Sequence, residues 1–202
     1  ISSKVELSPK GEYSPAAWSR AMAKGMEGFA NSLEKLMPDI VLLFGDRAET
    51  MTLCLTAAYM GIPIAHVQAG DKSGHIDDSS RYAIAKLGHI HFASCKDSAE
   101  RLRKLGEQEF RIFNTGAPQL DDINRSFDKS NILIEDINID LNKPYLLLVY
   151  HPVMVERDEI DEQISAVIEA CLESKLSVIW IAPNSDLGHG NILKLINKYK
   201  NN

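Results

Sequence analysis

The sequence predicts an α/β protein made of two Rossmann-like domains, each built on a parallel β-sheet. Three observations lead to this fold class. Short apolar runs alternate strictly with stretches of helical periodicity, which is the pattern of parallel strands joined by helices. A polar, less regular stretch at residues 121–143 interrupts the alternation once. Chemically active side chains follow the apolar runs, where open parallel sheets bind their ligands.

The elements of the first domain follow one another without interruption. Apolar residues recur at helical spacing from 15 to 37, with Ser14 placed to cap the start and Pro38 to end the helix. The continuously apolar run at 39–45 predicts a parallel strand covered on both faces. Further strands are expected at 62–67, 89–94 and 110–116, and helices at 47–61, 77–88 and 97–106.

The alternation begins again after the polar stretch. We expect strands at 144–152 and 176–183 and helices at 158–175 and 190–200. The predicted organisation is therefore a partial domain over residues 1–138 and the start of a second over 139–202.

The composition is that of an ordinary globular protein. The 202 residues are 45% hydrophobic and 25% charged, enough for one large domain or parts of two. The net charge of −6 disfavours a nucleic-acid or anionic-membrane partner, and no apolar run approaches the roughly 18 residues of a membrane span. The cysteines Cys54, Cys95 and Cys171 lack metal-binding spacing, so we expect buried, reduced thiols in a cytoplasmic protein. Because the chain starts at Ile1, we also expect a segment of a longer protein.

Polar side chains follow four of the predicted strands. Asp46 and Arg47 come after the first and Gln68 after the second. His151 stands at the end of the first strand of the second domain, and Asn184 follows the second. Strand ends of this kind, two from each domain, favour a cleft between the domains. Aspartate and asparagine also cap helices and favour turns, and this is the alternative for Asp78 and Asp186.

The histidines suggest a metal less strongly than a structural role. His89 and His91 alternate on one strand and share a face, yet histidine often fills a half-buried strand face. His66 lies inside its strand, where we expect it to be satisfied in the core. A metallohydrolase using His66, Asp71, His75 and Asp77 is a third, weaker hypothesis.

Several long motifs resemble the hydrolysing UDP-N-acetylglucosamine 2-epimerases of sialic-acid and legionaminic-acid synthesis. These motifs are GDRAE, IPIAHVQAGDKSGHIDDSSRYAIAKLGHIHF, RIFNTGAPQLDDI and YHPV. The resemblance implies two Rossmann-like domains facing a cleft, as in the GT-B glycosyltransferases. Family members are roughly twice as long, so both domains of this chain would be incomplete, and it would be inactive alone.

The resemblance also implies roles for individual residues. Asp46 and Asp77 match two catalytic acids of the family, and His151 matches its histidine at the end of a second-domain strand. Arg47 and Arg81 match basic positions that bind substrate or hold the carboxylates by bidentate pairing, and Asn184 is expected at the substrate. The implied protein is a cytoplasmic homo-oligomer, a dimer or tetramer, that acts on a UDP-sugar without a metal or other cofactor.

Gln68 departs from the family pattern. Relatives typically have HIEGGE where this chain has HVQAGD, so an amide replaces an acid. Either Asp71 supplies the missing carboxylate, or Gln68 contacts a different sugar. The expected substrate is UDP-N-acetylglucosamine, and the alternative is a UDP-2,4-diacetamido-2,4,6-trideoxy sugar. A nucleotide-sugar binding module that has lost turnover is the rival function.

Overall fold

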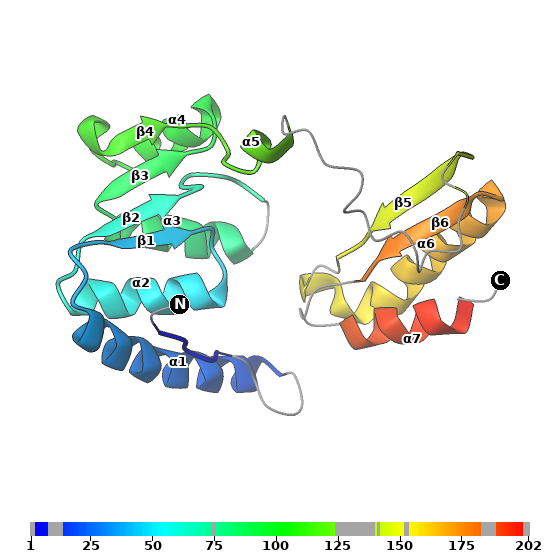
Figure 1. Ribbon diagram of the computed structural model, residues 1–202, viewed down its shortest axis with the longest axis horizontal. Coiled ribbons are helices and arrows are strands. Elements are labelled where there is room, and N and C mark those ends of the chain that lie inside the picture. Colours follow the sequence, from blue (N-terminus) through cyan, green and yellow to red (C-terminus); the bar gives the residue numbers. More distant parts are fainter. Residues whose placement is uncertain are drawn as a thin grey trace. The chain divides into compact units, whose positions relative to one another are not determined.

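The computed structural model describes residues 3–7, 14–73, 76–123, 140, 142–151, 154–182 and 189–199. The chain divides into two compact units, Ile1–Phe127 and Asp128–Asn202 (Figure 1). The predicted domain boundary between 138 and 139 lies outside the described residues. Within the described parts, no helix is both long and apolar enough to cross a membrane.

The first unit contains the alternation of strands and helices that the sequence predicts. Its sheet has four parallel strands in the order β1-β2-β3-β4. The strands are β1 (Val41–Phe44), β2 (Ile64–Val67), β3 (Ile90–Ala93) and β4 (Ile112–Asn114), and the helices are α1 (Pro15–Leu36), α2 (Ala48–Tyr59), α3 (Ile76–Leu87), α4 (Lys96–Lys104), the 3-10 turn η1 (Glu109–Arg111) and α5 (Leu120–Ile123).

The ends of α1 follow from local residues. Ser14 accepts a hydrogen bond from the Ala17 N–H at 3.1 Å, and Pro15 occupies the first helical position. At the other end Met37 adopts a left-handed conformation and donates its N–H to the Leu33 carbonyl at 2.8 Å. The predicted cap at Ser14 is confirmed, and the helix ends at Leu36, before Pro38, as predicted.

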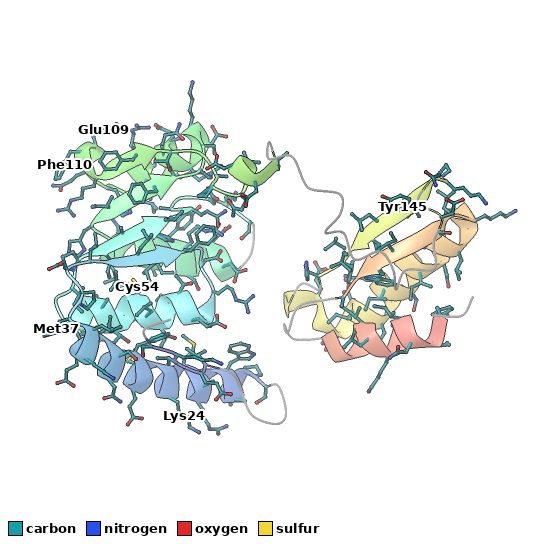
Figure 2. The ribbon with its side chains drawn as sticks, viewed as in Figure 1. Lys24, Met37, Cys54, Glu109, Phe110 and Tyr145 are labelled. Carbon is teal, nitrogen blue, oxygen red and sulfur yellow. The ribbon has the colours of Figure 1, made fainter. Side chains whose placement is uncertain are left out.

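The core of this unit lies on one face of the sheet. Val41, Leu43 and Ile64 pack there against α1, α2 and α3, and Cys54 of α2 lies between that helix and the sheet (Figure 2). On the opposite face, Leu42, Phe44 and Phe113 are 65%, 51% and 48% exposed. The prediction that β1 is covered on both faces therefore does not hold within the described residues, because the described helices place their core side chains on one side.

The cysteines also differ from the prediction of buried thiols. All three are free, but only Cys54 is buried, while Cys95 is exposed and Cys171 is intermediate. Burial raises the pKa of the Cys54 thiol to about 11, which keeps it protonated and unreactive at neutral pH.

The second unit repeats the pattern with fewer elements. β5 (Tyr145–Val149) pairs in parallel with β6 (Ser177–Ile181). The 3-10 segment η3 (Met154–Glu159) leads into α6 (Ile160–Ser174), and α7 (His189–Tyr199) follows β6. Its core consists of Ile160, Ile164, Ile168 and Ile192 from the two helices, with Trp180 of β6 packed against them.

An extended segment, residues 3–7, lies along α1, although the sequence shows no clear element there. The Ser3 and Ser32 hydroxyls are 2.7 Å apart. Nearer the helix start, Leu7 packs directly on Gly25 and is 8% exposed. Glycine thus leaves the space on α1 that the segment occupies.

We expect Gly25→Ala to lower the melting temperature of the protein. An added Cβ would overlap Leu7 Cδ1 and lie 2.8 Å from Leu7 Cγ. Such overpacking costs about 1–3 kcal/mol, which exceeds the gain of about 1 kcal/mol in helix propensity. Gly190→Ala on α7 is the matched control, because its added Cβ meets nothing within 4 Å. Equal melting temperatures for the two variants would show that the segment does not rest on Gly25.

Candidate active site

The centre of the site is an ion pair between Asp46 and Arg81. Gly45, with φ of +72°, turns the chain at the end of β1 and is followed by Asp46. Arg81, on α3, donates from Nη2 to Asp46 Oδ2 across 35 positions of sequence. The two side chains are only 14% and 10% exposed. A strand end and a helix are thus joined by largely buried opposite charges.

Burial dominates the acidity of Asp46. Loss of water around the carboxylate raises its pKa above the ordinary value, and this effect outweighs the opposing attraction of Arg81. The nearby charges of Asp77 and, more weakly, Asp78 raise the pKa further. Asp77 is therefore close enough to Asp46 for their charges to interact, and it lies one helical turn before Arg81 on α3. The structure thus brings together three residues that the sequence proposed for one site.

Gln68 lies beside the turn that carries Asp46. Its side-chain Oε1 would be 3.9 Å from a Cβ added to Gly45. Its φ of +60° is in the left-handed region. The other described non-glycine residues with positive φ, Met37 and Lys175, are helix C-caps, whereas Gln68 directly follows β2. Strain of this kind is often held at functional positions.

Asp71 is anchored at the start of α4. Its Oδ1 accepts hydrogen bonds from the Ser94 hydroxyl and, at 2.6 Å, from the Ser98 hydroxyl. Gly70, with φ of +77°, allows the close approach, because a Cβ there would overlap the Ser98 carbonyl oxygen. The carboxylate is therefore fixed between the ends of β2 and β3.

Asp78 has a different task from its neighbour Asp77. Its Oδ1 accepts from the backbone N–H of Ser73 at 2.6 Å and from the Ser73 hydroxyl at 3.0 Å. The carboxylate therefore ties the preceding loop to α3. Among the alternatives for Asp78, a structural role fits these contacts.

The remaining predicted site residues are Arg47, His151 and Asn184. Arg47 follows Asp46, its side chain is 51% exposed, and its Nε lies 3.4 Å from Glu49 Oε2. His151 is exposed and follows β5 in the second unit. Asn184 and the loop residue His75 lie outside the described residues.

Each described histidine of the first unit contacts protein groups. His66 Nε2 is 2.8 Å from the Gly45 carbonyl oxygen, and His91 Nε2 is 3.3 Å from Glu107 Oε2. His89 accepts the Ile64 N–H through Nδ1 at 3.2 Å. Among the residues that the structure describes, no group of three His, Cys, Asp or Glu side chains is arranged to hold a metal ion.

Sequence reasoning missed the partners that orient this site. Ser94 and Ser98 hold Asp71, and His66 contacts the turn before Asp46. One signal was available, because His66 is a polar residue inside an otherwise apolar strand. The serine pair carries no comparable signal, since serine is common at helix starts.

A parallel sheet with carboxylates, a guanidinium and an amide at the carboxyl ends of its strands defines a ligand-binding protein of the Rossmann-like class. The comparisons with known proteins then identify the family. The model of the UDP-N-acetylglucosamine 2-epimerase family matches residues 3–202, so the chain belongs to that family.

Curated relatives include enzymes for different sugars. The chain is 37% identical over 185 residues to the hydrolysing UDP-N,N'-diacetylbacillosamine 2-epimerase of Legionella pneumophila, covering 91% of this chain and 49% of the relative. It is 31% identical over 170 residues to the UDP-N-acetylglucosamine 2-epimerase of Neisseria meningitidis, covering 83% and 44%. The chain thus spans about half the length of the curated relatives it matches.

Solved structures confirm the fold class. The UDP-GlcNAc 2-epimerase of Neisseria meningitidis bound to UDP-GlcNAc matches with a TM-score of 0.73 at 20% identity, covering 94% of this chain and 53% of that one. The Methanocaldococcus jannaschii enzyme in complex with UDP-GlcNAc and UDP matches with a TM-score of 0.72 at 20% identity, again over 94% and 53%. The predicted α/β, GT-B-like fold class is therefore correct.

We expect Gln68→Gly to stabilise the protein by about 1 kcal/mol, because a side chain in the left-handed region costs roughly that much. Urea unfolding followed by circular dichroism measures the change. Lys175→Gly is the matched control, with a φ of +56° at the end of α6, and should give a similar gain. A loss of stability in Gln68→Gly alone would mean that the glutamine side chain contributes more than its backbone strain costs.

Proposed function

We propose that the whole protein is a hydrolysing UDP-sugar 2-epimerase, which inverts C2 of an N-acetylated UDP-sugar and releases UDP. The observation that carries the proposal is the Asp46–Arg81 pair at the end of β1 with Asp77 beside it, in a chain that belongs to the 2-epimerase family. The arrangement supplies buried negative charge next to a proton acceptor, which the reaction requires.

The chemistry explains why carboxylates are needed. The C2 proton is a weak acid, because C2 is not next to a carbonyl. When the C1–O bond to the diphosphate breaks, UDP leaves with the bonding electrons and C1 gains oxocarbenium character, which acidifies C2–H. A carboxylate takes that proton and leaves a glycal. Water then adds across the C1–C2 double bond. Its hydroxyl goes to C1, and a proton goes to C2 on the face opposite to the one from which the original proton was removed, which inverts C2.

The environments of the carboxylates support separate roles. Asp46 has the raised pKa of a stronger base, and Arg81 keeps it oriented, so we assign it the C2 proton. Asp77 supplies negative charge near the developing cation. Asp71, held through Oδ1 by two hydroxyls, supplies the carboxylate that Gln68 lacks. We further propose that His151 takes part in catalysis and that Arg47 and Asn184 bind the substrate.

For the substrate, we propose UDP-N,N'-diacetylbacillosamine, which is a UDP-2,4-diacetamido-2,4,6-trideoxyglucose. The relative in Legionella pneumophila, 37% identical, is named for that UDP-sugar, and the relative in Campylobacter jejuni, 32% identical, is named for the same sugar linked to GDP or UDP. UDP-N-acetylglucosamine is the competing substrate, after the relative in Neisseria meningitidis. We propose that the product serves nonulosonic-acid synthesis of the legionaminic type. We also propose that the enzyme is a cytoplasmic homo-oligomer.

The rival function is a nucleotide-sugar binding module without turnover. UDP release by the full-length protein, followed with a coupled assay, separates the two. We expect release from the diacetamido sugar. Tight binding of the sugar without UDP release would instead establish the binding module.

We expect Asp46→Asn and Asp77→Asn each to reduce kcat by roughly 10²–10³-fold while the protein stays folded, since loss of one charge aimed at the transition state costs about 3–4 kcal/mol. Asp78→Asn is the matched control, because the asparagine oxygen can still accept from Ser73. It should keep kcat within about fivefold. Normal turnover in Asp46→Asn or Asp77→Asn would make that residue structural.

Asp78→Asn should change the pH profile of kcat/KM. The base Asp46 must be ionised, so kcat/KM falls as pH decreases through its pKa. Asp78 raises that pKa through its negative charge. Asp78→Asn should therefore move the acid limb of kcat/KM to lower pH.

Asp71 and Gln68 are tested with both UDP-sugars. We expect Asp71→Asn to reduce turnover of both by roughly 10²-fold or more, because the amide keeps the serine contacts and loses the charge. Gln68→Glu should leave the preference between the sugars unchanged and turnover unchanged or lower, since a second anion beside Asp71 raises a carboxyl pKa. A changed sugar preference in Gln68→Glu, together with normal turnover in Asp71→Asn, would make Gln68 a substrate contact instead.

A further inference from the structure

His66 is a fully buried histidine that joins two strands near the site. It lies in the middle of β2 on the helix-covered face of the sheet, and its exposed fraction is 0%. Its Nε2 is 2.8 Å from the carbonyl oxygen of Gly45, which follows β1. Because a carbonyl oxygen only accepts, Nε2 carries the proton, and the neutral ring has its lone pair at Nδ1.

The residue that His66 holds is the one before Asp46. Gly45 also donates its own N–H to the Val67 carbonyl at 3.1 Å. Both polar backbone groups of Gly45 are therefore bonded to β2, and its φ of +72° directs the next residue out of the strand. Asp46 is then held at its side chain by Arg81. Asp46 is therefore held in two ways. The backbone before it is bonded to β2 through Gly45, and its carboxylate oxygen is bonded to Arg81 on α3.

We propose that His66 is a positioning residue for Asp46, holding the Gly45–Asp46 turn through its single N–H so that the carboxylate meets the C2 proton. The inference rests on the proposed function, because the position of Asp46 affects the rate only if Asp46 accepts the C2 proton. A displacement of about 1 Å in a reacting group can reduce the rate roughly 100-fold. The hydrogen bond from His66 prevents a displacement of that kind, so its loss should reduce the rate by a similar factor.

The surroundings of the ring keep it neutral in this role. Burial lowers the pKa of His66 to about 4, and the positive charges of Arg81 on α3 and of a protonated His91 on β3 act in the same direction. The Gly45 hydrogen bond and the negative charge of Asp71, in the loop after β2, oppose them less strongly. His66 therefore donates one hydrogen bond throughout the neutral range and takes no part in proton transfer.

Three substitutions in the full-length protein separate positioning from mere packing. Glutamine places an amide N–H where His66 Nε2 lies, asparagine places it nearer Nδ1, and leucine removes it. We expect His66→Gln to keep kcat within about fivefold, and His66→Asn and His66→Leu to lose roughly 100-fold with KM little changed. His66→Leu should melt no lower than His66→Gln, because glutamine buries an additional amide oxygen, and this cost offsets the hydrogen bond to the Gly45 carbonyl that leucine loses.

His91→Leu is the matched control. His91 is the register partner of His66 on β3 and is equally buried, but its Nε2 lies by Glu107 and not by Gly45. It should leave kcat of the folded protein within about fivefold, whatever its effect on the melting temperature. Equal kcat losses in His66→Gln and His66→Leu, or losses that follow the melting temperature across all four variants, would overturn the inference.

A measurement without turnover separates failure of this inference from failure of the proposed function. Carboxyl ¹³C NMR of Asp46 should show its raised pKa in the parent protein, in His66→Gln and in His91→Leu. In His66→Leu the freed turn exposes the carboxylate, so its pKa should fall toward the ordinary value. An unchanged Asp46 pKa in His66→Leu refutes the positioning role, even if the parent protein releases no UDP. UDP release that is absent from the parent protein refutes only the function.

Discussion

The ion pair between Asp46 and Arg81 is the interaction on which the site of the first unit depends. It links the end of β1 to α3 across 35 positions of sequence, with both side chains largely withdrawn from water. A buried charge is costly unless it is paired, so removing either partner leaves an uncompensated ion. The pair thereby holds the first turn of α3, which carries Asp77, against the carboxyl end of β1. Any ligand of Asp46 is therefore also close to a second acid.

The acidic residues around this pair show how the same side chain acquires different tasks. Asp46 faces a guanidinium, Asp71 accepts from two serine hydroxyls, and Asp78 accepts from a loop serine. Burial and neighbouring carboxylates raise the pKa of Asp46. For Asp78, the two contacts to Ser73 indicate a structural role, and its charge also raises the pKa of Asp46. The partner, and not the residue type, decides the chemistry.

Strand β2 contributes two polar residues near the site, one within the strand and one directly after it. His66 points into the covered face and bonds the turn after β1, while Gln68 ends the strand in a left-handed conformation beside that turn. The opposite face of the sheet carries the exposed apolar side chains Leu42 and Phe44. Polar groups thus collect at the strand ends and on the helix side of this strand, and apolar surface remains on the other side.

The sequence by itself determined the α/β class, the order of strands and helices, and the ends of α1, because periodicity and capping depend on residues that are close in the chain. It also placed Asp46 and Gln68 at strand ends, since apolar runs end where these residues begin. Only the tertiary structure decided that Arg81 pairs with Asp46, that serines hold Asp71, and that β1 is covered on one face. Those contacts join residues 23 to 35 positions apart, and packing between elements, which no local pattern encodes, brings them together.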